Sequence, residues 1–382
     1  MKIAYLGKIQ LSDVDLSYLH ELQQQADVTY IMEVNPRFMQ GPAFQFLKLY
    51  PKSGLFKAVD IYPEYQRLKG FIELDRCYVL NTTGKYWLLK SFWTHLLLLM
   101  FLFRQHFDTI QCAWPPNLYE FVLYFLRKKL VLTVHDPFPH TGNDTLIVRI
   151  RRKMAFWLIP RLIILNKAQR GEFLTFYHLP EHRVFNSRLS SYTYLQTIVQ
   201  SANHHTDGRY ILFAGKISPY KGLDFLLPAM EIVHNACPDC RLVVAGGGKF
   251  HFDVGRYQSS DYINIRNRFI PDEELVTLIR NCFFMVCPYT DATQSGVIMS
   301  AFAFNKPVIA TNVGGLPEMV DHERFGVIVK EKDVNELAES IIKLWKAPDK
   351  VKYYSDEIRK SYGTGELSWK HIATEMIGIY LS

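Results

Sequence analysis

Two lysines follow a predicted strand at a position where a phosphate group can bind. The segment 211–222 ends a buried strand and begins a helix, and Gly215 permits a tight turn between them. Lys216 and Lys221 then lie at the carboxyl end of the strand, beside the start of the helix. Two cations together with free backbone N–H groups can clamp a diphosphate, although lysines are also common on any protein surface.

A second group of residues that could bind a ligand lies between positions 289 and 320. The pattern there predicts a loop, a helix over Val297–Phe304, a short buried strand over Val308–Ala310, a glycine turn and another helix. The loop delivers Ser295 and Gly296 to the helix start, where unpaired N–H groups and the positive end of the dipole suit a phosphate. The alternative is an ordinary helix cap. The arrangement favours a nucleotide-type ligand at the carboxyl edge of a parallel sheet.

One histidine follows a buried strand in the first half of the chain. The predicted strand Leu130–Val134 is followed directly by His135, and ligands of open α/β sheets bind at such strand ends. A single histidine is more often structural than functional, so the position alone identifies a candidate and no more.

Composition limits the classes of protein to which the chain can belong. With 382 residues the chain is too long for one ordinary core, so about two domains are expected. A hydrophobic share of 48% and a charged share of 21% describe a globular protein. The net charge of +7 suits an anionic substrate or a membrane surface, but the basic residues are dispersed and no nucleic-acid motif is present. The six cysteines are expected to be reduced thiols, and no zinc-like spacing predicts a metal.

Strands and helices alternate in two series. Residues 1–190 are predicted to form one domain, 191–208 a polar linker and 209–362 a second domain, and a helix in 363–382 closes the chain. The strands expected in the first series lack an apolar–polar alternation, as in a parallel sheet covered on both faces: Lys2–Leu6, Val28–Met32, Thr109–Ala113, Leu130–Val134 and Arg161–Leu165. Two doubly wound α/β domains with a ligand cleft between them are therefore expected.

The segment 86–107 is unusually apolar. Residues 96–103 form an unbroken apolar run, far shorter than the roughly 20 residues that span a bilayer. One interpretation is a buried crossover helix. The other is a helix lying in the membrane interface beside the basic residues Arg149, Arg151, Arg152 and Lys153, which would suit a lipid-carried substrate. No hydrophobic run near the start resembles an export signal, so a cytoplasmic protein, at the inner face of the cell membrane if the helix binds lipid, is expected.

Several motifs, taken in order, resemble those of the retaining nucleotide-sugar glycosyltransferases of family 4, also called glycosyl transferase group 1. The donor clamp, the glycine-rich strand end, the base-contacting turn and the C-terminal signature of that family are similar to Phe213–Gly222, Val243–Gly248, Phe269–Leu275, and Lys306–Thr311 with Gly314–Glu318. Each motif is weak alone, but their order and spacing agree across about 150 residues. The N-terminal half resembles the family more loosely.

This resemblance implies a GT-B fold, in which two Rossmann-like doubly wound domains face a central cleft. It implies a metal-independent reaction without a cofactor, with a nucleoside-diphosphate sugar as donor and Lys216 and Lys221 in place of a divalent ion. The catalytic residues it suggests are His135, Asp291, Lys216 and Lys221. The donor contacts it suggests are Gly215, Lys216, Lys221, Gly247, Ile270, Gln294, Ser295, Gly296, Val297 and Ser300. The acceptor contacts that we add from their positions after predicted strands are Asp13, Trp114 and His140.

The chain departs from the family at one point. Most members carry two glutamates, eight positions apart, across the loop and helix of the signature, and here Ala292 and Ser300 occupy those positions. Asp291 or Gln294 can supply part of what is lost, and Ser300 can still hydrogen-bond a hydroxyl, with less strength than a carboxylate.

Three hypotheses follow. The first is a retaining hexosyltransferase acting on a glycan or lipid-linked oligosaccharide in surface polysaccharide synthesis, with helix 86–107 as a peripheral membrane contact. The second is a non-catalytic GT-B subunit that binds donor or a partner glycosyltransferase, suggested by the missing glutamates. The third is another GT-B enzyme, such as an epimerase or a disaccharide synthase. A dinucleotide oxidoreductase is excluded, because Ala245–Gly248 lacks the GxGxxG spacing.

Overall fold

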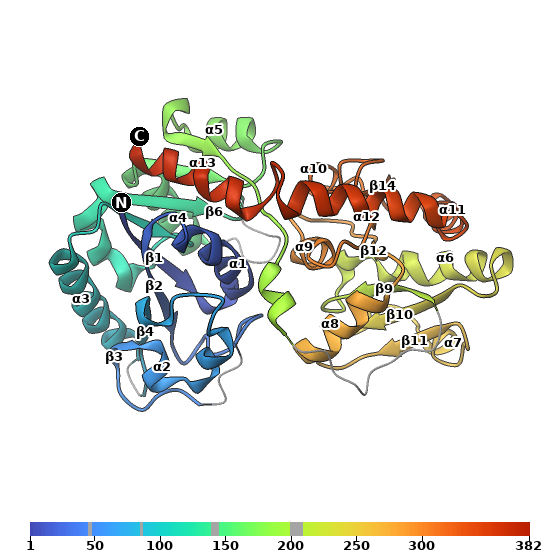
Figure 1. Ribbon diagram of the computed structural model, residues 1–382, viewed down its shortest axis with the longest axis horizontal. Coiled ribbons are helices and arrows are strands. Elements are labelled where there is room, and N and C mark those ends of the chain that lie inside the picture. Colours follow the sequence, from blue (N-terminus) through green and yellow to red (C-terminus); the bar gives the residue numbers. More distant parts are fainter. Residues whose placement is uncertain (45–47, 85–86, 139–144, 199–208) are drawn as a thin grey trace. The chain divides into compact units, whose positions relative to one another are not determined.

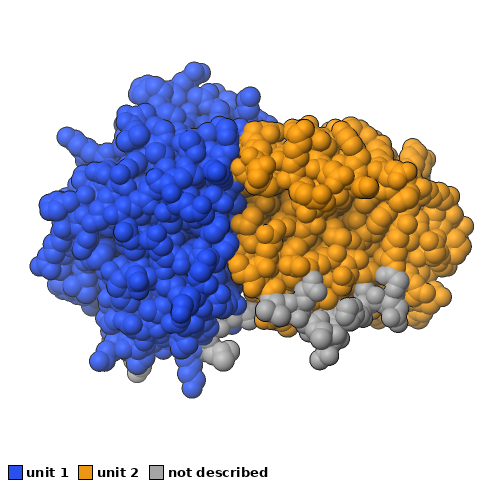
Figure 2. Space-filling model, viewed as in Figure 1, with its two compact units in different colours: residues 1–189, 369–382 blue, residues 190–368 orange. Residues whose placement is uncertain are grey.

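The computed structural model describes residues 1–44, 48–84, 87–138, 145–198 and 209–382 (Figure 1). The chain forms two compact units (Figure 2). Unit 1 contains residues 1–189 and 369–382, and unit 2 contains residues 190–368. The last helix therefore belongs to unit 1, and the described part of the predicted linker, residues 191–198, belongs to unit 2.

Unit 1 is built on an eight-stranded sheet with the order β3-β4-β2-β1-β5-β6-β7-β8. Its strands are β1 (Lys2–Lys8), β2 (Asp27–Val34), β3 (Gly54–Lys57), β4 (Cys77–Asn81), β5 (Thr109–Cys112), β6 (Leu130–Val134), β7 (Arg161–Ile164) and β8 (Val184–Asn186). All pair in parallel except β3, which pairs antiparallel with β4 at one edge. The sequence expectation of an all-parallel sheet is therefore wrong at this edge, and the short strands β3, β4 and β8 were not foreseen.

Six helices and several 3₁₀ turns accompany this sheet. They are α1 (Ser12–Gln23), α2 (Ala58–Ile61), α3 (Trp87–Gln105), α4 (Leu146–Leu158), α5 (Arg170–Tyr177) and α13 (Trp369–Leu381), together with η1 (Ile9–Leu11), η2 (Pro63–Leu68), η3 (Leu74–Arg76), η4 (Leu118–Lys129) and η5 (Glu181–Arg183). The helix α13 packs against α1, where the hydroxyls of Tyr18 and Tyr380 lie 2.9 Å apart. None of the helices in the described ranges is long and apolar enough to cross a membrane.

Unit 2 is built on a six-stranded parallel sheet with the order β11-β10-β9-β12-β13-β14. Its strands are β9 (Tyr210–Ala214), β10 (Arg241–Ala245), β11 (Ile263–Arg266), β12 (Met285–Cys287), β13 (Val308–Thr311) and β14 (Gly326–Val329). Its helices are η6 (Thr193–Thr197), η7 (Pro219–Lys221), α6 (Leu223–Ala236), α7 (Gly255–Gln258), α8 (Asp272–Asn281), α9 (Gly296–Phe302), α10 (Leu316–Val320), α11 (Val334–Trp345) and α12 (Pro348–Gly363). The short apolar strands are buried almost throughout, as expected for a sheet covered on both faces.

Candidate functional site

The strand order of unit 2 defines one place where a ligand is expected. From β9 the chain proceeds outward through β10 to β11, and from β12 it proceeds the other way through β13 to β14. The carboxyl ends of β9 and β12 are neighbours at the point where this direction reverses. This point is called the switch point of the sheet, and ligands of open α/β sheets bind there. The segments that follow these two strands, 215–222 and 288–295, contain six of the eleven site residues predicted in unit 2.

Glycines bring the backbone of this region close together. Gly215 has a φ of 121°, its N–H donates to the carbonyl of Ala245 at 3.0 Å, and a Cβ at this position would lie 3.5 Å from Val297. A Cβ on Gly246 would lie 1.9 Å from the carbonyl oxygen of Gly215, so only glycine fits there. The predicted donor residue Gly247 accepts a hydrogen bond from the N–H of Ile217 at 3.0 Å. The ends of β9 and β10 and the start of α9 therefore adjoin one another.

Lys221 is the most unusual charge in this region. The residue before the start of α6, Gly222, adopts a φ of 67°, and a Cβ there would lie 1.8 Å from the carbonyl oxygen of Pro288, so η7 rests against the end of β12. The ammonium of Lys221 lies 3.6 Å from the ring centroid of Tyr289. Burial lowers the pKa of Lys221 to about 8, against a small opposing effect from Cys287. Among the described residues no carboxylate forms an ion pair with Lys221.

Tyr289 joins Lys221 to the predicted helix start. This tyrosine is 1% exposed, and its hydroxyl accepts a hydrogen bond from Ser295 Oγ at 3.4 Å. The sequence analysis did not single it out. The one signal that could have done so is its position directly after a buried strand at the end of the sheet, where an aromatic face can hold a cation.

The serine side chains among the predicted donor residues at α9 form hydrogen bonds within the helix itself. Ser295 is 2% exposed, and its Oγ accepts a hydrogen bond from the N–H of Ile298, so it is the N-cap. Ser300 donates its hydroxyl to the carbonyl of Gly296 at 2.9 Å. The helix has seven residues and ends earlier than predicted, and Asn305 beyond its end adopts a left-handed conformation with a φ of 56°. A helix this short is a weak anion site, and any anion binding here depends mainly on the lysines.

The remaining predicted residues of unit 2 are more open. Lys216 and Asp291 are exposed, and Ile270, Gln294 and Val297 are half-buried. The loop that carries Asp291 rests on a glycine turn, because a Cβ on Gly314 would lie 1.5 Å from the carbonyl oxygen of Ala292. The structure therefore places Lys221, Ser295 and Val297 together at the switch point, but within the described ranges the side chains of Lys216 and Asp291 form no hydrogen bond or ion pair.

The switch point of unit 1 lies between β1 and β5 and holds a very different cluster. Lys8, at the end of β1, forms ion pairs with the carboxylates of Glu33 and Glu120, the latter at 2.6 Å. Glu120 also accepts hydrogen bonds from the backbone and side-chain nitrogens of Asn117 at 3.0 and 2.7 Å. Burial alone would raise the pKa of Glu120, but the charges of Lys8 and His95 outweigh burial and lower it to about 2.

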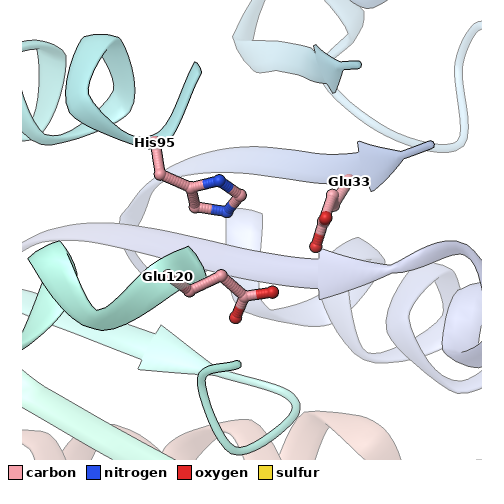
Figure 3. Close-up of side chains that lie close together, drawn as sticks. All are labelled: Glu33, His95 and Glu120. Atoms are coloured by element: carbon pink, nitrogen blue, oxygen red, sulfur yellow. The ribbon is translucent and has the colours of Figure 1, made fainter. Parts of the chain in front are cut away.

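His95 completes this cluster (Figure 3). It is 2% exposed, and its Nδ1 lies 2.7 Å from the carbonyl of Ser91. One ligand atom from each of Glu33, His95 and Glu120 lies within 4.8 Å of the others, a spacing that can hold a metal ion. The ammonium of Lys8 already contacts both carboxylates, so a divalent ion would have to displace it. The cluster is thus a buried group of charges in which one lysine already pairs with both carboxylates.

The candidate residues of unit 1 do not share one cavity. Trp114 lines the cavity that contains Lys8 and His95. His135 lines another, together with Gln111, Thr133 and residues of α13. Asp13 lies in the first turn of α1, where its Oδ1 accepts a hydrogen bond from the N–H of Val14 at 2.9 Å. The predicted acceptor residue His140 lies outside the described residues.

The Nε2 atom of His135 is buried. It is inaccessible to solvent and has no hydrogen-bond partner among the residues the structure describes. Burial lowers the pKa of His135 to about 4, with a smaller opposing effect from Asp136. The imidazole is therefore neutral at pH 7, and it can exchange a hydrogen bond with a ligand but cannot supply a positive charge.

Comparison with known sequences gives a family for unit 2. Residues 208–347 match the family described as glycosyl transferases group 1. A D-inositol 3-phosphate glycosyltransferase of Jonesia denitrificans is 27% identical over 194 residues, which cover 46% of this chain and 43% of that protein. An uncharacterized glycosyltransferase of Haemophilus influenzae is 23% identical over 255 residues, 65% of this chain and 70% of that protein. The chain spans less than half the length of the first of these relatives.

Solved structures resemble the chain over its whole length. Sucrose-phosphate synthase from Thermosynechococcus elongatus has a TM-score of 0.68 and 16% identity, with 100% of this chain and 98% of that chain covered. HepE of Anabaena, solved in complex with UDP and glucose, has a TM-score of 0.70 and 15% identity, with both chains covered completely. At such identities the likeness establishes the fold alone, and it confirms the predicted GT-B class. The chain thus has the GT-B fold, and its residues 208–347 match the glycosyl transferases group 1 family.

Proposed function

We propose that the protein is a retaining glycosyltransferase of the hexosyltransferase type. It transfers a sugar from a nucleoside-diphosphate sugar, bound by unit 2, to a hydroxyl of a glycan or lipid-linked oligosaccharide in bacterial-type surface polysaccharide synthesis. The group 1 domain and its glycosyltransferase relatives support the class of reaction. The reaction is proposed to take place in the cytoplasm, at the inner face of the cell membrane.

Lys221 is the single observation that carries this proposal. A largely buried ammonium without a carboxylate partner destabilises a protein, unless an anion completes its surroundings. It lies at the switch point of the sheet, beside glycines that let a ligand approach the backbone. A diphosphate at this place would restore the charge balance, and this is the part of a nucleotide sugar that carries the negative charge.

The same cation can stabilise the transition state. When the bond between the sugar and the diphosphate breaks, negative charge develops on the leaving oxygen. Lys221, assisted by the exposed Lys216, would stabilise that charge without a metal ion, and its position is fixed by η7 and the ring of Tyr289 before any donor binds. Preorganised charge of this kind costs no rearrangement during the reaction. His135 and Asp291 remain predicted sugar contacts.

A non-catalytic subunit that binds donor is the second candidate. It is supported by one observation, the absence of both glutamates at the positions of Ala292 and Ser300. The hydroxyl of Ser300 donates to the carbonyl of Gly296, so it has no donor left for a sugar hydroxyl. Asp291, exposed in the same loop, is the carboxylate that would have to take over the sugar contact.

Slow donor hydrolysis separates the two candidates without knowledge of the acceptor. Purified protein is incubated in EDTA with UDP-, GDP- and ADP-sugars, and the release of nucleoside diphosphate and the anomeric form of the freed sugar are measured by NMR. We expect one donor to be hydrolysed with retention, and the rate to fall by about a hundredfold in Lys221→Met. Lys343→Met, which removes an exposed lysine on α11, serves as the matched control. Donor binding without hydrolysis would favour the non-catalytic subunit, and inversion would reject a retaining mechanism.

A further inference from the structure

The exposed apolar side chains of the described chain are concentrated on three neighbouring elements of unit 1. Six of the large exposed ones lie on α3, two on η4 and five on α4. They are Leu88, Leu89, Trp93, Leu97, Met100 and Phe103, then Phe121 and Phe125, and then Leu146, Ile147, Ile150, Trp157 and Leu158. Only eight others are exposed in the rest of the described residues. So strong a concentration marks an interaction surface.

The helix α3 has two apolar faces. The inner face packs into the core of unit 1 through Leu98, Leu99 and Leu102. The outer face repeats at helical spacing and exposes 63% of Leu89, 57% of Trp93 and 54% of Phe103. The sequence left open whether this segment is a buried crossover helix or an interfacial one, and the structure shows one helix with both a buried and an exposed apolar face. Figure 1 shows α3 along the outer side of unit 1.

The outer faces of the three elements are connected. The helix α3 packs against η4, where the rings of Phe92 and Phe121 stack with centroids 5.8 Å apart. The start of η4 is joined to α4, because the guanidinium of Arg151 donates to the side-chain oxygen of Asn117. We call the exposed side chains of α3, η4 and α4 the apolar-cationic face.

Every exposed charge on these three elements is positive. Lys90 and Arg104 lie on α3, Lys128 and two neighbours on η4, and Arg149 and Lys153 on α4. Their one acidic residue, Glu120, is 3% exposed and pairs with Lys8. Arg152, which the sequence analysis grouped with this basic run, is not part of the face, because it is 4% exposed and donates to the carbonyl of Asp136.

We propose that the apolar-cationic face docks unit 1 onto an anionic lipid bilayer. The apolar side chains enter the boundary between headgroups and acyl chains, and the lysines and arginines bind lipid phosphates. Long cationic side chains suit this geometry, because their methylene groups lie along apolar surface while the charged end stays in water. The contact is peripheral, as no helix among the described residues is long and apolar enough to cross the membrane.

The charges favour a bilayer over a second copy of the chain. A twofold contact through this face would place each set of cations against the same cations of the other copy, and like charges at such a contact are strongly unfavourable. An anionic bilayer satisfies both the apolar and the cationic side chains at once. The proposal stands on these surface residues alone, and vesicle binding can be measured without donor or acceptor, so its failure would remove the membrane location from the proposed function and leave the proposed sugar transfer untouched.

The test is flotation of the full chain with lipid vesicles. One set contains phosphatidylcholine only, and the other replaces roughly a third of it by phosphatidylglycerol. A charge variant carries Lys90→Gln, Arg104→Gln and Lys153→Gln, with Lys343→Gln, Lys346→Gln and Lys352→Gln on unit 2 as its matched control. An apolar variant carries Trp93→Gln, Leu97→Gln and Phe103→Gln, with Ile232→Gln, Tyr353→Gln and Leu381→Gln as its matched control. All of these side chains are exposed, so the variants should fold, which circular dichroism verifies.

We expect the wild type and both controls to float with the anionic vesicles and to bind the neutral ones at least about tenfold more weakly. The charge variant should lose about tenfold or more in affinity, and salt at about 0.5 M should have the same effect on the wild type. The apolar variant should also lose its binding to the anionic vesicles. A wild type that stays at the bottom of the gradient, or variants that float as well as their controls, would overturn the proposal. So would a wild type that forms dimers abolished in the apolar variant without binding vesicles.

Discussion

Two lysines at strand ends, one in each unit, differ in the way their charge is balanced. Lys8 is the last residue of the inner strand β1 of unit 1 and pairs with Glu33 and Glu120. Lys221 lies at the corresponding end of the sheet of unit 2, in contact with the ring of Tyr289 and with no paired carboxylate among the described residues. A lysine near the switch point of the sheet is thus paired with carboxylates of the protein in unit 1 and has no such partner among the described residues in unit 2. A cation without a carboxylate partner in the protein indicates a binding site for an anion.

The difference extends to the residues around each lysine. At the switch point of unit 1 the acids and the histidine are buried, and both acids pair with Lys8. At the switch point of unit 2, Lys221 is surrounded by glycines with close backbone contacts and by an exposed loop that carries Asp291. A ligand can therefore supply in unit 2 what Glu33 and Glu120 supply in unit 1. Substitutions at the two lysines should have opposite effects on stability.

The largest effect is expected from Lys8→Met. The substitution leaves two buried carboxylates without their cation, so the free energy of unfolding should fall by about 3–5 kcal/mol in urea titrations. The triple variant Lys8→Met, Glu33→Gln and Glu120→Gln removes the orphaned charges and should regain most of the loss. A Lys8→Met protein within about 0.5 kcal/mol of wild type would show that the cluster is not a structural ion pair.

A buried acid of unit 1 that is protonated in the folded protein gives a pH-dependent effect. Asp15 is fully buried and accepts hydrogen bonds from the hydroxyls of Tyr5 and Tyr30 at 2.7 and 3.2 Å. Burial raises its pKa from 3.8 to about 8, against the opposing effect of these bonds. The folded protein then holds a proton that the unfolded chain releases, so the stability that Asp15 contributes falls as the pH rises from 3.8 toward 8.

Asp15→Asn should remove this dependence. Relative to wild type, the variant should gain at most about 1.4 kcal/mol for each pH unit between 5 and 8. Urea unfolding of both proteins across this range measures the difference. A constant difference between the two proteins would mean that Asp15 titrates near its ordinary pKa.

The pH dependence of donor binding sharpens the comparison at Lys221. Since burial lowers the pKa of Lys221 to about 8, the ammonium is present in the free protein below that pH and is lost above it. An anionic donor binds the charged form, so its Kd should be constant below pH 8 and rise by up to about tenfold for each pH unit above it. Calorimetric titration between pH 7 and 9.5 tests this, and Lys221→Met should bind weakly without the break near pH 8. An unbroken profile in the wild type would assign the anion to another group.

The smallest effect is expected in the protein without ligand. Lys221→Met removes a buried cation that lacks a carboxylate partner, so it should stabilise the free protein by about 1 kcal/mol at pH 7. The sign is opposite to that of Lys8→Met. The folded pKa of Lys221 lies below its unfolded value of 10.5, so the cost of burying the charge is complete below pH 8 and disappears as the pH rises from 8 to 10.5. The stabilisation of Lys221→Met relative to wild type should therefore shrink between pH 8 and 10.5. A variant less stable than wild type at pH 7 would contradict this prediction.

Much of unit 2 could be predicted from the sequence because the relevant signals are local. The strands ending at Ala214 and Ala245, the turn at Gly215 and the left-handed Asn305 follow from short apolar runs and from residues that favour particular backbone angles. The motifs that carry the family resemblance lie in the same unit.

The rest depends on contacts between distant residues. Lys8 pairs with residues 25 and 112 positions away, and only the order of strands in the sheet brings them together. The contact between Lys221 and Tyr289 arises in the same way, from β9 lying next to β12. The local pattern gave no reason to divide the segment 86–107 into an inner and an outer face, because apolar residues surround the helix on all sides.

The most direct test of the central claim is thermal unfolding with a panel of UDP-, GDP- and ADP-sugars in EDTA, applied to the wild type, Lys221→Met and the control Lys343→Met. If Lys221 is a cation completed by a nucleoside diphosphate, one nucleotide should raise the Tm of the wild type and of the control by several degrees and should leave that of Lys221→Met nearly unchanged. If no donor shifts the wild type, or if Lys221→Met is stabilised as much as the control, the switch point of unit 2 is not a diphosphate site.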